Sequence, residues 1–274
     1  SLKESTRVKE LIAQGNSYPT ALSLACREQF GEKISSVISS PNNTLAIEYI
    51  KAINEQKLNI KPICIKRKGV AHDSSETAIN IASASLIRQK AYNNQSFKNF
   101  LPYDILDEVL FDMENMTKAV LFKFKSMTIN EILEIPDCNK ELALRIFEYL
   151  KRETPANLSQ LYDSIKTKNI THARIRRVIL YGILGIKKED FNLKPYGRIL
   201  AINTKGTEIL SALSKLKEKE TMAISHSLSK LSKMGGDYER LAQLDVISSE
   251  FQKLCTKENI RFPNEYSVKF EKTK

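Results

Sequence analysis

Two groups of residues have the types and spacing of phosphate-binding sites, and the more compact is the run Ser83-Ala84-Ser85-Leu86-Ile87-Arg88. If a helix begins there, the serine hydroxyls and the unpaired backbone N–H groups of its first turn can hold phosphate oxygens. Arg88, one turn later, can neutralise the same phosphates. Serines at a helix start also serve as simple caps, and on this hexapeptide alone capping is the more common role.

Single polar residues also follow two predicted strands. Asn42 comes after a predicted strand over residues 33–39, and its amide could contact a base or a ribose hydroxyl, or cap the next helix. Arg67 follows a predicted strand over residues 60–66. It could contact a phosphate at the ligand-binding edge of a parallel sheet, or be a solvated loop charge. The residues themselves leave these alternatives open.

The second group is basic and occupies residues 166–205, which hold ten Lys and Arg residues against two acidic ones. This net charge of +8 is most of the +11 of the chain. Such a cluster binds phosphate backbones through counterion release, largely without reading sequence, although a solvated basic face is the alternative. Positive residues in the first turn of the predicted helix oppose its dipole, and this local cost indicates a functional reason for them. The residues predicted to contact nucleic acid are Lys166, Lys168, His172, Arg174, Arg176, Arg177 and Arg198.

The elements that must position the first group have an α/β pattern over residues 1–95. Strand, helix and strand with short connections predict a βαβ unit and a parallel sheet. Ligands of such sheets bind at the carboxyl ends of the strands, against helix N-termini. The predicted helices of this part cover residues 4–14, 18–29 and 44–56, and another begins within 81–88.

From about residue 100 onward the apolar residues recur at helical spacing, so this part is predicted to be mainly helical. A strand or turn is predicted over residues 197–203, and a loop or weak helix over 225–236. The predicted helices cover residues 103–113, 116–124, 128–134, 140–151, 157–166, 171–184, 206–218 and 238–256.

Composition excludes several classes of protein. The chain has 274 residues, of which 42% are hydrophobic and 27% charged, which is typical of a soluble globular protein. Its 9 Gly, 8 Pro and 4 Cys exclude collagen-like and disulfide-scaffold proteins. No segment approaches the roughly 18 apolar residues of a membrane span. We therefore expect a cytoplasmic protein with reduced thiols and no membrane partner.

Familiar catalytic templates do not occur in the sequence. The only histidines are His72, His172 and His226, and there is no Gly-x-Ser-x-Gly, His-Glu-x-x-His or Walker motif. The cysteines form no C-x-x-C pair, so no metal site is predicted. His72-Asp73 could act in proton transfer or bind a metal, but a loop pair is the simpler interpretation. No catalytic residue is assigned.

Five motifs in a fixed order resemble the tRNA(Met) cytidine acetate ligase family, bacterial proteins of the HIGH-type nucleotidyltransferase superfamily. The resemblance runs from about residue 10 to about residue 215. The motifs are Ser40-Pro41-Asn42-Asn43-Thr44-Leu45-Ala46-Ile47-Glu48-Tyr49, Ile65-Lys66-Arg67 with His72-Asp73, Ile81-Ala82-Ser83-Ala84-Ser85-Leu86-Ile87-Arg88, Ile165-Lys166-Thr167-Lys168 with Arg176-Arg177, and Tyr196-Gly197-Arg198-Ile199-Leu200 with Lys205-Gly206.

The resemblance implies an enzyme that activates acetate with ATP, accompanied by Mg2+, to give acetyl-adenylate. The acetyl group then passes to N4 of the wobble cytidine of elongator tRNA(Met). The implied fold class is α/β and then mostly α: residues 1–95 are the second half of a Rossmann-like ATP-binding domain, and residues 96–274 a mainly helical tRNA-binding domain. The implied ATP-binding residues are Asn42, Arg67, Ser83, Ser85 and Arg88.

The sequence also departs from the family pattern. No His-x-Gly-His motif occurs in the chain, and the family pattern places that ATP loop upstream of Ser1. We therefore expect this chain to be incomplete for catalysis. Two other functions stay open: a non-catalytic RNA-binding module on a vestigial nucleotidyltransferase fold, and a metabolite adenylyltransferase, which would not need the charge of residues 166–205.

Overall fold

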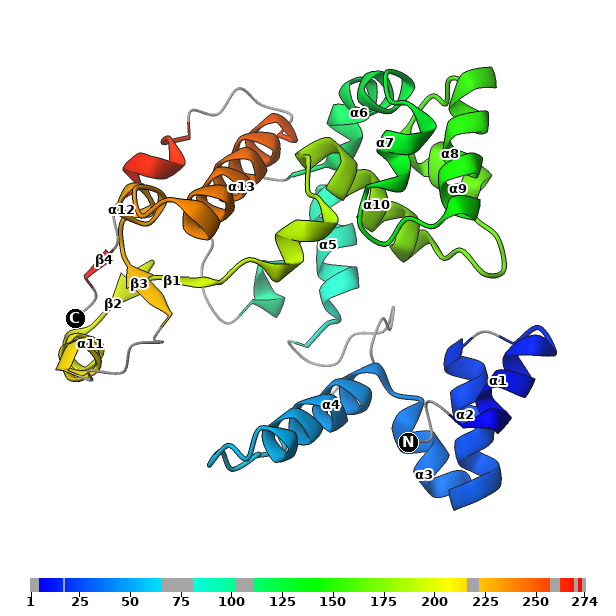
Figure 1. The fold of residues 1–274 in the computed structure, drawn as a ribbon, viewed down its shortest axis with the longest axis horizontal. Helices are drawn as coiled ribbons and strands as arrows, with labels where there is room; N and C mark the ends of the chain where they lie inside the picture. Colours follow the sequence, from blue (N-terminus) through cyan, green and yellow to red (C-terminus); the bar gives the residue numbers. More distant parts are fainter. Residues whose placement is uncertain are drawn as a thin grey trace. The chain divides into compact units, whose positions relative to one another are not determined.

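The structure is a computed structural model that describes residues 5–16, 18–65, 81–101, 111–215, 222–256, 262–268 and 271–272. The chain divides into two compact units, shown as a ribbon in Figure 1. Unit 1 comprises Ser1–Lys90 with Asn99–Leu101, and unit 2 comprises Ala91–Lys98 with Pro102–Lys274.

Unit 1 contains a small helical core near its N-terminus. The Ser5 side chain accepts a hydrogen bond from Val8 N and so caps the first helix. Val8 and Leu11 of that helix pack against Ala21 and Leu22 of the second. The helices of this unit are α1 (Thr6–Ala13), α2 (Tyr18–Phe30), α3 (Glu32–Ile38) and α4 (Pro41–Glu55), followed by the start of α5 (Ala84–Tyr92) and by η2 (Lys98–Phe100).

The strand predicted over residues 33–39 was wrong, because this segment forms α3. A short apolar run fits either period, and Ile34, Val37 and Ile38 are also spaced for one helix face. Contacts with α2 favour the helix: the Ser35 hydroxyl, buried, donates to Ser23 O at 2.9 Å.

The strand predicted over residues 60–66 is also wrong where it can be seen. Residues 58–65 form no strand. Pro62 has no N–H to donate to a ladder, and the side chains of Ile63 and Ile65 are 81% and 93% exposed. The parallel pair expected between this segment and residues 33–39 is therefore not formed by the described residues.

Unit 2 begins with helices whose bounds follow the predicted ones closely. Their starts are capped by Thr128, Asn139, Asn157 and Thr171, each of which accepts a hydrogen bond from the N–H three residues later. The helices are α6 (Thr117–Lys125), α7 (Ile129–Leu133), α8 (Lys140–Arg152), α9 (Leu158–Ile165) and α10 (His172–Leu184), with η3 (Met113–Met116) before them. The helix predicted over 103–113 falls mostly outside the described residues.

These helices share one core. Ile146 of α8, Leu161 of α9 and Ile175 and Ile179 of α10 are fully buried in it. Gly182 lets α10 approach α6 closely, because a Cβ at this position would lie 2.4 Å from Phe124 Cζ. The basic residues of α10 and of the connection before it therefore stand on a rigid base.

The remainder of unit 2 has two short parallel strand pairs. Strand β1 (Tyr196–Arg198) pairs with β3 (Ala223–Ser225), and β2 (Ala201–Ile202) pairs with β4 (Glu271–Lys272). The strand or turn predicted over 197–203 thus contains β2 and all of β1 except Tyr196. The other elements are η4 (Lys188–Asn192), α11 (Thr204–Lys215), α12 (Leu228–Ser232), α13 (Gly236–Leu254) and η5 (Glu265–Ser267). The run 225–236, predicted as a loop or weak helix, holds α12.

Candidate nucleic-acid interface and nucleotide site

The connection between α9 and α10 presents two exposed lysines, Lys166 and Lys168. The turn is closed by Thr167, whose Oγ1 accepts hydrogen bonds from Asn169 N at 3.2 Å and Ile170 N at 3.1 Å. The side chain of Ile170 is buried and anchors the turn in the core. The lysine charges therefore lie on an ordered turn, within reach of a polyanion.

One row of basic residues on α10 faces the connection between α7 and α8. Arg177 donates to Asp137 Oδ2 from Nη2 at 2.6 Å and from Nε at 3.1 Å. Arg174 Nε donates to the Asp137 backbone oxygen at 2.9 Å and lies 3.3 Å from its Oδ1. One carboxylate thus holds two guanidinium groups, and the trio keeps a net positive charge.

A second row on α10 faces α9. His172 Nε2 lies 2.9 Å from Asp163 Oδ1, and the Arg176 guanidinium lies 5.6 Å from the centre of the Tyr162 ring. Burial raises the pKa of the Tyr162 hydroxyl to about 12, with a further increase from Glu114 that Arg176 opposes. Tyr162 therefore serves as a neutral platform under the Arg176 cation.

A pocket of about 380 Å3 lies between α9, α10 and η3. Its basic wall is Arg176 and Arg177, and its acidic residues are Asp112 and Glu114. Burial tends to raise the pKa of Glu114, but hydrogen bonds from Leu158, Ser159 and Thr117 outweigh it, and the pKa lies below its ordinary value. The Glu114 charge is thus directed at the N-terminus of α9, and the arginines supply the cationic wall.

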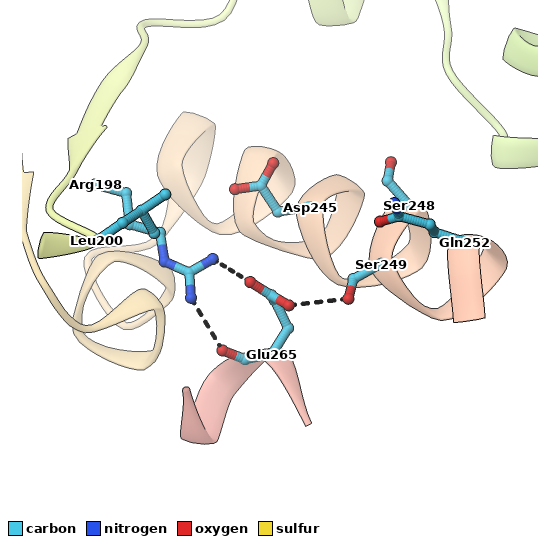
Figure 2. A pocket seen from close by; sticks show the side chains of 7 residues that line it. All are labelled: Arg198, Leu200, Asp245, Ser248, Ser249, Gln252 and Glu265. Carbon is cyan, nitrogen blue, oxygen red and sulfur yellow. Dashed lines mark hydrogen bonds and ion pairs between the residues drawn. The ribbon is translucent and has the colours of Figure 1, made fainter. Parts of the chain in front are cut away.

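Arg198 lies in a different place from the other predicted RNA-binding residues. Figure 2 shows its guanidinium directed at Glu265, with which it forms an ion pair, while Ser249 Oγ donates to the same carboxylate at 2.9 Å. Its side chain is 12% exposed. A pocket of about 410 Å3 beside this pair is also lined by Leu200, Asp245, Ser248 and Gln252. The role of Arg198 that the structure displays is to tie the segment around Glu265 to β1.

Of the residues predicted to bind ATP, Asn42 lies on α4, and Ser83, Ser85 and Arg88 lie at the start of α5. Asn42 is exposed in the first turn of α4. Ser83 Oγ accepts the N–H of Leu86 at 3.1 Å, so it caps α5, and Arg88 Nη2 lies 3.5 Å from Ser85 Oγ. The hydroxyls and the guanidinium of α5 form a donor set that suits phosphate oxygens. Arg67 and the pair His72-Asp73 lie outside the described residues.

Three further features of the described residues are the state of the cysteines, the grouping of metal-ligating side chains and the length of apolar helices. All four cysteines are free thiols, with Cys64 exposed and the other three buried. No three His, Cys, Asp or Glu side chains within the described ranges gather as a metal site would require. Among the described helices, none is long and apolar enough to cross a membrane.

Sequence reasoning missed the acidic partners of the basic residues. Asp137, Glu114 and Glu265 belong to no recognisable motif, and each acts on an element far away in the sequence. The positive φ of Asp137, 60°, leaves only a weak signal in the sequence, the preference of Asp and Asn for this conformation.

Comparison with known proteins places these features in context. A sequence model of the HIGH nucleotidyl transferase family matches residues 2–266. A tRNA(Met) cytidine acetate ligase of Clostridium novyi is 31% identical over 228 residues, 76% of this chain and 56% of that protein. The corresponding ligase of Halothermothrix orenii is 30% identical over 280 residues, 90% of this chain and 64% of that protein. The chain thus spans less than two thirds of the length of these relatives.

The fold has solved counterparts. The crystal structure of apo Thermotoga maritima TmcAL has a TM-score of 0.75 at 22% identity, covering 97% of this chain and 69% of that one. A crystal structure of the same protein bound with alpha-thio ATP has a TM-score of 0.73. The predicted fold class, an α/β part of nucleotidyltransferase type followed by a mostly helical part, is confirmed by this likeness.

Proposed function

Because the chain belongs to the HIGH nucleotidyl transferase family, we propose that it acts in the ATP-dependent acetylation of the wobble cytidine of elongator tRNA(Met). In the proposed reaction, acetate attacks the α-phosphorus of ATP, and pyrophosphate leaves as acetyl-adenylate forms. The N4 amine of cytidine then attacks the acetyl carbon, AMP leaves, and a proton is released. ATP, acetate and tRNA are the partners, and the cytoplasm is the expected compartment.

The observation that carries this proposal is the exposed basic surface of α10 and of the connection between α9 and α10. Lys166 and Lys168 extend from a turn that is closed by hydrogen bonds, and Arg176 rests on the Tyr162 ring above the core. An enzyme acting on a small metabolite has no use for cations spread along a helix and the turn that precedes it. An RNA backbone, which carries a charge at every nucleotide, is the partner that fits them.

Chemistry at the nucleotide is proposed to be mainly electrostatic. Asn42 and Arg67 would contact ATP, while Ser83, Ser85 and Arg88 would hold its phosphates at the start of α5. Cations and N–H groups placed there would stabilise the charge that develops on the phosphate as the carboxylate attacks. Mg2+ would supply further positive charge.

The test of RNA binding is a triple charge reversal in which Lys166, Lys168 and Arg176 become Glu. We expect the affinity for tRNA(Met) to fall at least tenfold, measured by fluorescence anisotropy in 150 mM salt, because three phosphate contacts are lost. Arg177 is left intact so that the Asp137 contact is preserved. Reversal of Lys118, Lys123 and Lys230, which are exposed on α6 and α12, is the matched control. Equal loss in both triple variants would refute the interface.

A second experiment separates the ligase from a non-catalytic RNA-binding module. Mass spectrometry of the wobble cytidine in a deletion strain should show loss of the N4-acetyl group, whereas deletion of a mere module would leave it in place. The 274-residue chain alone, which contains no His-x-Gly-His, should not support acetate-dependent exchange of pyrophosphate into ATP. Exchange by this chain would contradict the proposed incompleteness and leave the tRNA-binding result unaffected.

A further inference from the structure

Asp137 has an unusual place in unit 2. It lies in the connection between α7 and α8 with φ at 60°, the left-handed region that few non-glycine residues adopt. Its neighbours Ile135, Pro136 and Cys138 are all buried, so the connection is anchored in the core. The conformation lets one residue offer both its backbone oxygen and its carboxylate to α10.

The two arginines on Asp137 keep donors for a ligand. Arg174 uses Nε, and Arg177 uses Nε and Nη2. A guanidinium has five N–H groups, so most of those in this pair stay available. Lys188 Nζ donates to the oxygen of Leu133, the last residue of α7, at 2.7 Å and brings a third cation beside this connection. The free edges of two fixed guanidinium groups match the oxygens of a phosphodiester.

We propose that Asp137 is a positioning residue that presets Arg174 and Arg177 as a clamp for a phosphate of bound RNA. An arginine that is free to rotate loses side-chain entropy when it is fixed, whereas one already held by a carboxylate loses less. The inference rests on the proposed function, since it assumes that the anionic partner is tRNA.

If Asp137 only neutralised the two arginines, its substitution would change the affinity for RNA in the opposite direction from the loss of a positioning residue. Replacing Asp137 by Asn removes one negative charge beside a polyanion, so electrostatics alone would strengthen binding. The asparagine also tolerates the positive φ, and the fold is expected to survive. If Asp137 positions the arginines, the same substitution weakens binding instead. The direction of the change therefore separates the two roles.

The experiment measures the affinity of the full chain for tRNA(Met) by anisotropy in 150 mM salt. We expect Asp137→Asn to weaken binding about fivefold, because the clamp is no longer preorganised. Glu134→Gln is the matched control: Glu134 is exposed in the same connection, and the substitution removes the same charge. This control should bind tRNA as tightly as the wild type or slightly more tightly.

Asp137→Asn could also weaken binding by disturbing the fold around it. This possibility is tested by repeating Asp137→Asn in a chain that carries Arg174→Gln and Arg177→Gln. A positioning residue has nothing left to position there, so the fivefold loss should vanish. The Gln pair alone should lower the slope of log affinity against log salt by about 1.5, the value for two phosphate contacts. The double variant Arg174→Lys with Arg177→Lys keeps both charges but removes the planar guanidinium groups, so it should also weaken binding. It serves as the test if Asp137→Asn fails to fold.

Two results would overturn the inference: Asp137→Asn binding at least as tightly as the wild type, or a fivefold loss that persists without the arginines. If Asp137→Asn does not fold, unchanged binding by the double lysine variant overturns it as well. Failure of the wild-type chain to bind tRNA at all would instead remove the proposed function.

Discussion

Glu114 caps the N-terminus of a helix that begins forty-four residues later, by accepting the backbone N–H of Leu158 at 2.7 Å. The other oxygen of the same carboxylate accepts the N–H and the hydroxyl of Ser159, at 2.9 and 3.0 Å. The local cap, Asn157, accepts only the N–H of Gln160. A helix start needs several acceptors, and here a long-range carboxylate completes the set.

We predict that Glu114→Gln lowers the free energy of unfolding by about 2 kcal/mol, because an amide offers one acceptor in place of two and carries no charge for the helix dipole. Urea unfolding followed by circular dichroism measures the change. Glu148→Gln, which removes an exposed pair with Arg152, is the control and should cost at most about 0.5 kcal/mol. Equal effects of the two substitutions would contradict the long-range cap.

The close approach of α10 to α6 at Gly182 gives a second prediction. Alanine is normally better than glycine in a helix by about 1 kcal/mol. At Gly182, however, the new Cβ would also lie 2.9 Å from Ile135 Cδ1, so overpacking dominates. We expect Gly182→Ala to lower the melting temperature. Ala173→Gly, at an exposed site in the same helix, is the control and measures the effect of helix propensity alone. If Gly182→Ala raised the melting temperature instead, α6 and α10 would pack less tightly than described.

The pair Asp190–Arg240 predicts acid sensitivity. A hydrogen bond from Arg240 at 2.8 Å lowers the pKa of Asp190 below its ordinary value of 3.8, against the effect of burial. A carboxyl whose pKa is lowered by folding contributes stability above its unfolded pKa and loses it as pH falls through the folded pKa. Stability should therefore decline below about pH 4.

The variant Asp190→Asn isolates that contribution. It should be less stable than the wild type at pH 7. The difference should shrink as pH falls below about 4 and on through the lowered folded pKa, since both proteins then lack the charge. Denaturant unfolding at a series of pH values provides the measurement. A difference that stays constant across the series would mean that the Asp190 charge contributes nothing.

The ion pair between Arg198 and Glu265 gives a prediction about the C-terminal part of the chain. Glu265→Gln should speed hydrogen exchange of residues 262–268 by about tenfold, because one charged hydrogen bond to β1 is weakened. Glu208→Gln, on an exposed site of α11, should leave that exchange unchanged. If hydrogen exchange were unaltered in Glu265→Gln, the pairing of β2 with β4, and not this ion pair, would hold residues 262–268 in place.

The helices of unit 2 could be predicted because their signals are local. Thr128, Asn139, Asn157 and Thr171 each stand directly before a run with helical spacing, and Gly185 ends α10 with φ at 68°. The segment 33–39 was mistaken for a strand because seven residues fit both periods, and contact with α2 decides between them.

The candidate RNA interface could be predicted only in part. The density of charge in residues 166–177 is visible in the sequence, and the structure presents Lys166 and Lys168 as exposed. The partners are not visible: Asp137 meets Arg177 across 40 positions, and Glu265 meets Arg198 across 67. Such pairs depend on how the helices pack, which no local pattern encodes. The assignments to ATP and tRNA stay predictions.

The burial of Cys138, the neighbour of Asp137, gives the chain an internal reporter of local opening. Burial raises the pKa of this thiol to about 11, so at neutral pH it is protonated as well as shielded. An alkylating reagent can therefore reach it only when the connection between α7 and α8 transiently detaches from the core. Cys64, which is exposed, should react without any opening of the chain and so calibrates the reagent. The labelling rate of Cys138, with and without RNA, thus measures how firmly that connection is held.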